Sequence, residues 1–509
     1  MDGRVGSGHY RSLACQAPWN GRANEPWLIP AGCSPPKAES LMGLLTIEFW
    51  LFFCAVCTLH WCLPAHWRNG FLLAASVGFY AAWDAKLLCL LLAFTAVNHL
   101  IARLLSPRPG RRLRLLRIGI ALQCILLGAF KYLDFFIDSA QSLLARLGLT
   151  AEPLVLGLVV PIGLSYFCLR AIALLVDTYR GQSCGNLTLA EHTLYLLFFP
   201  SVTAGPIDRP RPFVEQLRAR SRPGWRESLP RGADLLLSGL LKKAVIANGL
   251  APAVDLAFAG DFASTGAAAL AALTYAVYIY ADFSGYTDIA RGVAAGLGFE
   301  LALNFRRPYG ARSPSEFWQR WHMSLSTWLR DYVFLPLGGA FRSRTRAYAN
   351  LLITMLLAGL WHGASWMFVF WGFYIGVLLV GHRTLQPSFK RLRRRLRLKG
   401  HFRQVAEAGL TFSLISAGWL LFRGTDLGQL ASALRGGVAS TAAGQTFAAQ
   451  VIPYAVVLLT LDLLAGEGEP LLLRGDRLPW WGKPILAAAF IYAVLVLGSD
   501  TQSFVYAQF

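Results

Sequence analysis

The hydrophobic and polar positions of this chain alternate on the scale of whole segments, with long apolar runs separated by short polar or basic connections. A helix needs about 20 mostly apolar residues to cross the hydrocarbon core of a bilayer. Runs that reach or approach this length lie at 44–63, 71–82, 86–105, 118–137, 154–176, 189–202, 264–281, 347–363, 365–381, 405–423, 447–466 and 484–498. Since 71–82 and 189–202 are short enough to be re-entrant or distorted, the pattern predicts an all-α polytopic membrane protein with about ten or eleven transmembrane helices.

Composition agrees with this fold class, because 55% of the 509 residues are hydrophobic and only 15% are charged, which excludes an ordinary soluble protein. No repeat or long linker divides the chain, so we expect one integral membrane domain at 44–509, preceded by a polar, disordered extension at 1–43. The nine cysteines are scattered without zinc-site spacing, which predicts neither a disulfide framework nor a metal site.

The net charge of +20 comes largely from basic loops beside the apolar runs. Positive-inside bias explains this better than nucleic-acid binding, since the basic residues are not interleaved with exposed aromatic ones. The densest runs, 103–117 and 390–403, are therefore expected in the cytoplasm, which puts the N-terminus outside. The same runs could also dock an acidic carrier protein or a phosphate-rich cofactor.

Three stretches between the runs do not fit membrane spans. Residues 203–232 are rich in proline and arginine and should lie outside lipid, and 234–257 contains two lysines among leucines, which predicts a helix partly at the interface. Ser313, Pro314 and Glu316 form a capping-box pattern that predicts a helix over 314–330. Its predicted apolar face comprises Trp318, His322, Leu325 and Leu329, flanked by Phe317, Trp321 and Trp328.

Of the nine histidines, only His322 and His362 lie in segments predicted to be ordered, apolar and interior at once. A lone histidine on an apolar face is usually a hydrogen-bonded core residue, but each of these follows a tryptophan, and Gly359 and Gly363 allow another backbone or a ligand to approach His362. A neutral imidazole can act as a general base on a hydroxyl. Ser365 is spaced as a nucleophile would be on the helix of His362, a spacing that also arises by chance.

Acidic residues in apolar surroundings are few. Asp282 and Asp288 flank Ser284 in YADFSGYTDIARG, where a span is expected to end and Gly285 permits a break. Structural pairing with an arginine is favoured over direct catalysis. The candidate partners are Arg291, Arg306 and Arg307.

Several of these stretches resemble the membrane-bound O-acyltransferase family, in particular the bacterial branch that includes the alginate O-acetylation subunit and the D-alanyl transferase of teichoic acids. They are YLLFFPSVTAGPIDRP, YIYADFSGYTDIARG, LNFRRPYGARSPSEFWQRWHMSLSTWLRDYVFLPLGG, NLLITMLLAGLWHGASWMFVFWG and the ending FVYAQF. Together they cover most of the chain from about residue 44 onward, and the length and QRWHMSLSTWLRDY favour the alginate-like branch.

The resemblance implies a ring of tilted helices around a tunnel that joins a cytoplasmic acyl donor to an extracytoplasmic acceptor. The resemblance also implies that His362 is the catalytic residue and that His322 is its partner in the active site. We expect His362 to take the proton of an acceptor hydroxyl that attacks a thioester carbonyl, while His322 orients or stabilises the reacting group. Supporting or tunnel-lining roles are expected for Trp361, Trp321, Trp318, Asp282, Ser284, Asp288 and Arg307.

The implied reaction is acetyl transfer from acetyl-CoA or another acyl thioester to an exported polysaccharide. Neither a bound cofactor nor a metal is expected, and the implied partners are membrane lipid and esterase-like periplasmic proteins that receive the acetyl group first. D-alanyl transfer to teichoic acid is the alternative within the enzyme class. A transporter, which would share broken helices and polar groups near the midplane, and a scaffold for an envelope machine are alternatives outside it.

Overall fold

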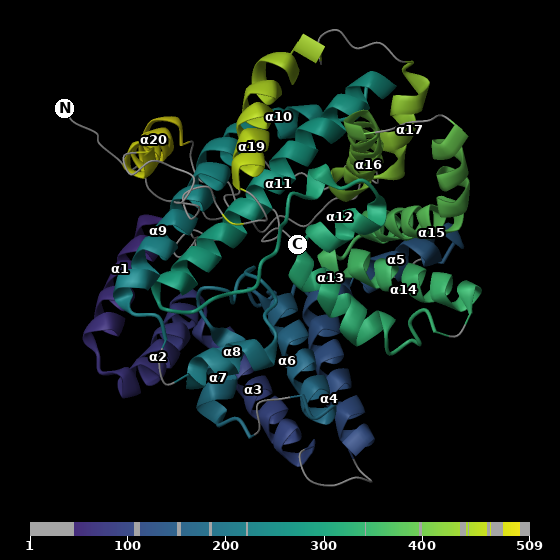
Figure 1. Ribbon diagram of the computed structural model, residues 1–509. Coiled ribbons are helices and arrows are strands. Elements are labelled where there is room, and N and C mark those ends of the chain that lie inside the picture. The colour runs from purple at the N-terminus through teal and green to yellow at the C-terminus, as the bar shows by residue number, and fades with distance from the viewer. Residues whose placement is uncertain are drawn as a thin grey trace, which may run out of the picture. The chain divides into compact units, whose positions relative to one another are not determined.

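The computed structural model describes residues 45–105, 112–149, 154–182, 186–219, 222–341, 343–395, 400–437, 444–445, 447–465, 469 and 482–498. Every regular element in these ranges is a helix, which confirms the predicted all-α class (Figure 1). The extension 1–43, the ending FVYAQF and parts of both basic runs lie outside the described residues. The α-helices are α1 Ile47–Cys62, α2 Ala65–Trp83, α3 Ala85–Leu105, α4 Arg112–Leu127, α5 Leu133–Arg146, α6 Leu164–Tyr179, α7 Leu189–Leu197, α8 Pro210–Arg218, α9 Trp225–Leu240, α10 Asn248–Ala257, α11 Thr265–Gly296, α12 Pro314–Arg320, α13 Met323–Leu329, α14 Arg344–His362, α15 Trp366–Arg395, α16 Gly400–Arg423, α17 Leu427–Arg435, α19 Ile452–Ala465 and α20 Gly482–Leu497.

Within the described ranges, seven helical segments are long and apolar enough to cross a membrane, which makes this a multi-pass membrane protein. Many of their apolar side chains face outward: only 11% of the window in Phe447–Leu464 is buried, as expected for a helix against lipid. The larger number of about ten or eleven spans stays a prediction. The seven segments are Ala85–Leu105, Arg112–Arg146, Trp225–Ala257, Thr265–Gly296, Trp366–Ser388, Gly400–Arg423 and Phe447–Leu464.

The long helix α11 runs beside α9, α10 and α16 (Figure 1). It continues without interruption through Gly285, so the break expected there is wrong. A Cβ on Gly285 would lie 2.9 Å from the carbonyl oxygen of Gly239 on α9. The glycine therefore serves the close approach of two helices, and no turn is needed.

The segment Trp225–Ala257 also departs from the prediction of a helix partly at the interface. A π-helical turn, η3 (Leu241–Ala247), joins α9 to α10, so the whole segment is one candidate span. Lys242 donates to Asp288 on α11 at 2.7 Å, and Lys243 donates to Asp282 at 2.5 Å. Pairing with these carboxylates lets the two lysines lie inside the helical assembly.

Two other predicted runs differ in length from the observed helices. The run 154–176 becomes helical only at α6, after Gly163 with φ 71°. The run 189–202 contains α7, whose nine residues cover less than half of the hydrocarbon core at about 1.5 Å per residue. Its short length agrees with a segment that does not cross the membrane by itself.

Candidate functional site

His362 is the last residue of α14, a helix that begins where the Ser343 side chain accepts the N–H of Arg346. The helix packs along α15 through a pair of glycines: a Cβ on Gly359 would lie 3.1 Å from Cα of Gly372. The small-residue pattern around His362 therefore does serve the close approach of another backbone. Because α14 ends there, the His362 ring lies at the junction of two packed helices.

The end of α14 also rules out the nucleophile geometry considered for Ser365. This residue is not on the helix of His362; its hydroxyl accepts the N–H of Met367 at 3.2 Å, at the start of α15. Serine commonly caps the first turn of a helix in this way. Ser365 thus has a structural role in the α14–α15 junction.

The predicted helix over 314–330 begins as expected but is interrupted in the middle. Ser313 accepts the N–H of Glu316, and α12 then ends at Arg320. His322 takes the left-handed conformation, with φ 42°, and α13 starts at the next residue. The single apolar face assigned to this segment is therefore wrong, since its two halves are separate helices.

Asn304 holds the chain at this interruption. Its backbone oxygen accepts the N–H of Met323 at 2.9 Å, and its side-chain oxygen accepts that of Ser324 at 3.1 Å. The same oxygen lies 3.2 Å from Nδ1 of His322. A side-chain oxygen accepts, so Nδ1 carries the proton and Nε2 the lone pair.

His322 is neutral at pH 7 in this environment. Its side chain is fully buried and packs edge-on against the ring of Phe283 at 4.7 Å. Burial lowers the pKa of the His322 imidazole, which lies outside the candidate spans, below its ordinary value. The neutral ring thus presents the lone pair of Nε2 as a hydrogen-bond acceptor.

Trp361 links the two histidines. The centre of its ring lies 6.0 Å from that of His322 and 5.1 Å from that of His362. The histidines are also close enough to interact electrostatically. Their common neighbour brings together two residues that are 40 positions apart in the sequence, from α14 and from the α12–α13 junction.

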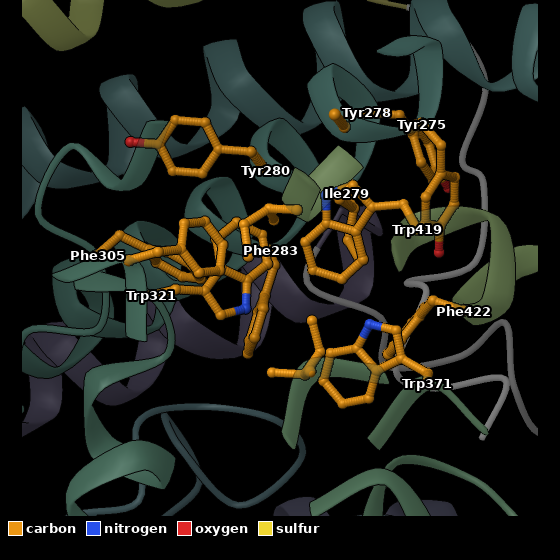
Figure 2. Close-up of a cluster of buried hydrophobic side chains, with 14 of the residues drawn as sticks. Tyr275, Tyr278, Ile279, Tyr280, Phe283, Phe305, Trp321, Trp371, Trp419 and Phe422 are labelled. Atoms are coloured by element: carbon orange, nitrogen blue, oxygen red, sulfur yellow. The ribbon is translucent and has the colours of Figure 1, made fainter. Parts of the chain in front are cut away.

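Aromatic side chains surround both rings. Trp371 and Phe422 pack edge-on against His362, with ring centres at 5.0 and 5.2 Å. The ring of Trp318 lies 5.8 Å from that of Trp371. Trp321 and Trp419, both labelled in Figure 2, have ring centres 5.2 Å apart. The predicted tryptophans thus belong to one aromatic cluster, in which Trp361 contacts both histidines.

A small polar cavity of about 20 Å³ is lined in part by Asn304. Ser284 and Asp288, two predicted site residues, line it together with Asn304. Its volume suits about one water molecule. Ser284 and Asp288 therefore share a cavity with Asn304, the residue that contacts His322. The cavity is lined by Lys242, Tyr280, Ser284, Thr287, Asp288, Leu303, Asn304, Phe305, Asp462 and Glu469.

The remaining acidic and basic candidates have structural partners. The expected pairing is seen between Asp288 and Arg291, whose charged atoms are 3.6 Å apart, but the shorter ion pairs of both acids are with Lys242 and Lys243. Arg307 donates through Nε to the backbone oxygen of Asp462 on α19, at 2.7 Å. It therefore ties α19 to the loop before α12.

Some residues of this region had no sequence signal. Asn304 and Trp371 are ordinary residues of a loop and of an apolar run, and only the fold places them beside the histidines. Two further histidines, His60 and His192, are also buried, contrary to the prediction that only His322 and His362 would be interior. In the described part of the chain, no group of three or more His, Cys, Asp or Glu could hold a metal ion.

The model of the membrane-bound O-acyltransferase family matches residues 155–420, which include both histidines and the cluster between them. This chain belongs to that family. The chain is 37% identical to the probable alginate O-acetylase AlgI of Azotobacter vinelandii, over 75% of this chain and 74% of the relative. It is therefore an acyltransferase of the membrane.

Two other relatives bear on the acyl group. The chain is 31% identical to the peptidoglycan O-acetyltransferase of Helicobacter pylori, over 72% of each of the two proteins. It is 28% identical to the teichoic acid D-alanyltransferase of Streptococcus thermophilus, over 57% of this chain and 75% of the relative. Both the identity and the share of this chain that is covered are higher for the two relatives named for acetyl transfer.

Proposed function

We propose that this enzyme moves an acetyl group from a cytoplasmic thioester to hydroxyls of an exported, alginate-like polysaccharide, across a bacterial inner membrane with the N-terminus outside. The observation that carries the proposal is the pair of buried histidines against one tryptophan. A neutral imidazole can take the proton of a hydroxyl while that hydroxyl attacks an acyl carbonyl.

In the proposed reaction, His362 removes the proton from the acceptor hydroxyl as its oxygen attacks the thioester carbonyl. His322 orients the reacting group or stabilises the developing negative charge. The intermediate then expels the thiolate, which takes the proton from His362, and the acetyl ester remains on the acceptor. The aromatic cluster around both rings excludes the water that would otherwise hydrolyse the thioester.

The nature of the acyl group is supported by the relatives. The two relatives named for acetyl transfer are 37% and 31% identical to this chain. The D-alanyltransferase is 28% identical to it, over a smaller share of this chain. Acetyl-CoA is the proposed donor, and esterase-like periplasmic proteins are the proposed partners that receive the acetyl group before the sugar. D-alanyl transfer is distinguished by comparing acetyl and D-alanyl donors in one acceptor assay.

Membership of an acyltransferase family decides against the transporter and scaffold interpretations. The reaction is tested by proton NMR of ester-bound acetyl groups on the exported polysaccharide. The measurement uses a strain without the gene that carries the unchanged gene, His362→Ala or His192→Ala at matched membrane levels. His192 is a suitable control because its side chain is also buried and is hydrogen-bonded to the side chain of Asn98 on α3.

We expect the unchanged gene and His192→Ala to restore acetyl esters and His362→Ala to leave less than about 1% of them, since removing a general base costs 10²–10⁴-fold. If His362→Ala restores acetyl esters fully, His362 is a core residue and the mechanism is wrong. If the unchanged gene restores none, the acyl group or the polymer is different.

A further inference from the structure

A π-helical turn, η2 (Gly128–Tyr132), interrupts the candidate span formed by α4 and α5. Such turns are rare and occur often at functional sites, because the extra residue changes the direction of the side chains beside it. The last two residues of this turn are Lys131 and Tyr132, which the sequence analysis did not single out. Both side chains extend to the end of α14.

Their contacts fall on three consecutive residues. Tyr132 donates from its hydroxyl to the backbone oxygen of Leu360 at 2.8 Å. Lys131 donates from Nζ to the backbone oxygens of Trp361 at 2.8 Å and His362 at 3.4 Å. These are the last three residues of α14, whose carbonyls have no partner within the helix itself.

The chemistry of both donors suits this position. The C-terminal end of a helix carries partial negative charge, so an ammonium group is favoured there. The third contact of Lys131 is with the hydroxyl of Ser165 at 3.3 Å, and in the described ranges no carboxylate forms an ion pair with it. An ionisable residue within a membrane span is expensive and is usually retained for function.

We infer that Lys131 and Tyr132 are positioning residues that hold the end of α14, and with it the imidazole of His362, in the geometry required for acyl transfer. This assignment rests on the proposed function of His362. Neither residue touches the imidazole by a hydrogen bond to the ring; both act through the backbone that carries it. Misplacement of a catalytic group by about 1 Å can lower the rate 10²-fold.

The test compares Lys131→Met, Lys131→Arg and Tyr132→Phe in membrane vesicles supplied with acetyl-CoA and the exported polysaccharide. The initial rate of acetyl ester formation is measured against acetyl-CoA concentration, per amount of folded protein. Lys86→Met and Tyr492→Phe are matched controls, because both side chains are exposed on other helices. Melting temperatures in detergent show whether each variant is folded.

We expect Lys131→Met to lower kcat about 10- to 100-fold and to leave KM for acetyl-CoA within about threefold, with an unchanged melting temperature. Lys131→Arg should retain most of the rate because a guanidinium donates to the same two carbonyls. Tyr132→Phe should lower kcat several-fold. The double variant Lys131→Met with Tyr132→Phe should lose less than the product of the single losses, since both contacts fix one helix end.

The outcomes separate the two proposals. If His362→Ala is inactive while Lys131→Met and Tyr132→Phe keep the full kcat, the positioning role is wrong and the proposed function stands. A loss of rate that only follows a loss of folded protein in Lys131→Met also overturns the positioning role. If His362→Ala is active, or the unchanged protein forms no acetyl esters, the proposed function is wrong and the positioning role falls with it.

Discussion

The side-chain oxygen of Asn304 lies 3.2 Å from Nδ1 of His322 and accepts the backbone N–H of Ser324 at 3.1 Å. One carboxamide therefore sets the protonation of the ring and the direction of the chain after it. A group that binds the second ring nitrogen of a functional histidine orients the ring, and its replacement commonly lowers activity.

Replacement of Asn304 by alanine should lower acetyl transfer about 10- to 100-fold, because His322 loses the partner that fixes its tautomer. Asn304→Asp keeps an oxygen acceptor and should retain more activity than Asn304→Ala. The measurement is ester-bound acetyl content at matched membrane levels. The control is Asn350→Ala, which removes another buried amide, one that donates to the backbone oxygens of Leu337 and Gly339. Equal losses at both positions would mean a general folding defect.

The backbone conformation of His322 allows its chemistry to be separated from its structural role. With φ 42°, the position favours asparagine and glycine over alanine. His322→Asn and His322→Ala should both lose at least about 100-fold in acetyl transfer. His322→Asn should remain folded to a higher temperature in detergent. Substantial activity in His322→Asn would show that the imidazole has no part in the reaction.

The buried pair of Lys243 and Asp282 can be tested as a structural pair. Their side chains are 5% and 0% exposed. Asp282→Leu alone should cost about 3–5 kcal/mol of stability, because it removes the buried carboxylate that pairs with the ammonium of Lys243. The double variant Asp282→Leu with Lys243→Met should recover most of that loss and should transfer acetyl groups. A folded but inactive double variant would give one member of the pair a direct part in the reaction.

Gly285 should tolerate no side chain, because its Cβ would meet the backbone of η3 and α9. Gly285→Ala places a methyl group 2.8 Å from the backbone nitrogen of Lys243 and should destabilise the protein by about 1–3 kcal/mol. Gly381→Ala, in α15, meets nothing within 4 Å and should stabilise by about 0.5–1 kcal/mol. Thermal unfolding in detergent compares the two. A neutral Gly285→Ala would mean that α9 and α11 separate easily.

Sequence patterns located the segments of this protein and the residues most suited to chemistry. Long apolar runs predict helices, because backbone polar groups in lipid must be satisfied within the segment. The runs at 86–105 and 405–423 correspond closely to α3 and α16. His322 and His362 were recognisable because an imidazole in an apolar segment is unusual, and both belong to the region that the family model covers.

The tertiary structure decided how these segments end and which polar groups meet. Helix periodicity predicts one helix over 314–330. The contacts of Asn304, which lies outside that segment, stabilise an interruption at His322. Likewise, the partners of Asp282 and Asp288 are lysines 39 and 46 residues earlier in the chain. The apolar pattern determines where helices form, whereas hydrogen bonds and ion pairs between distant segments depend on packing that no local pattern records.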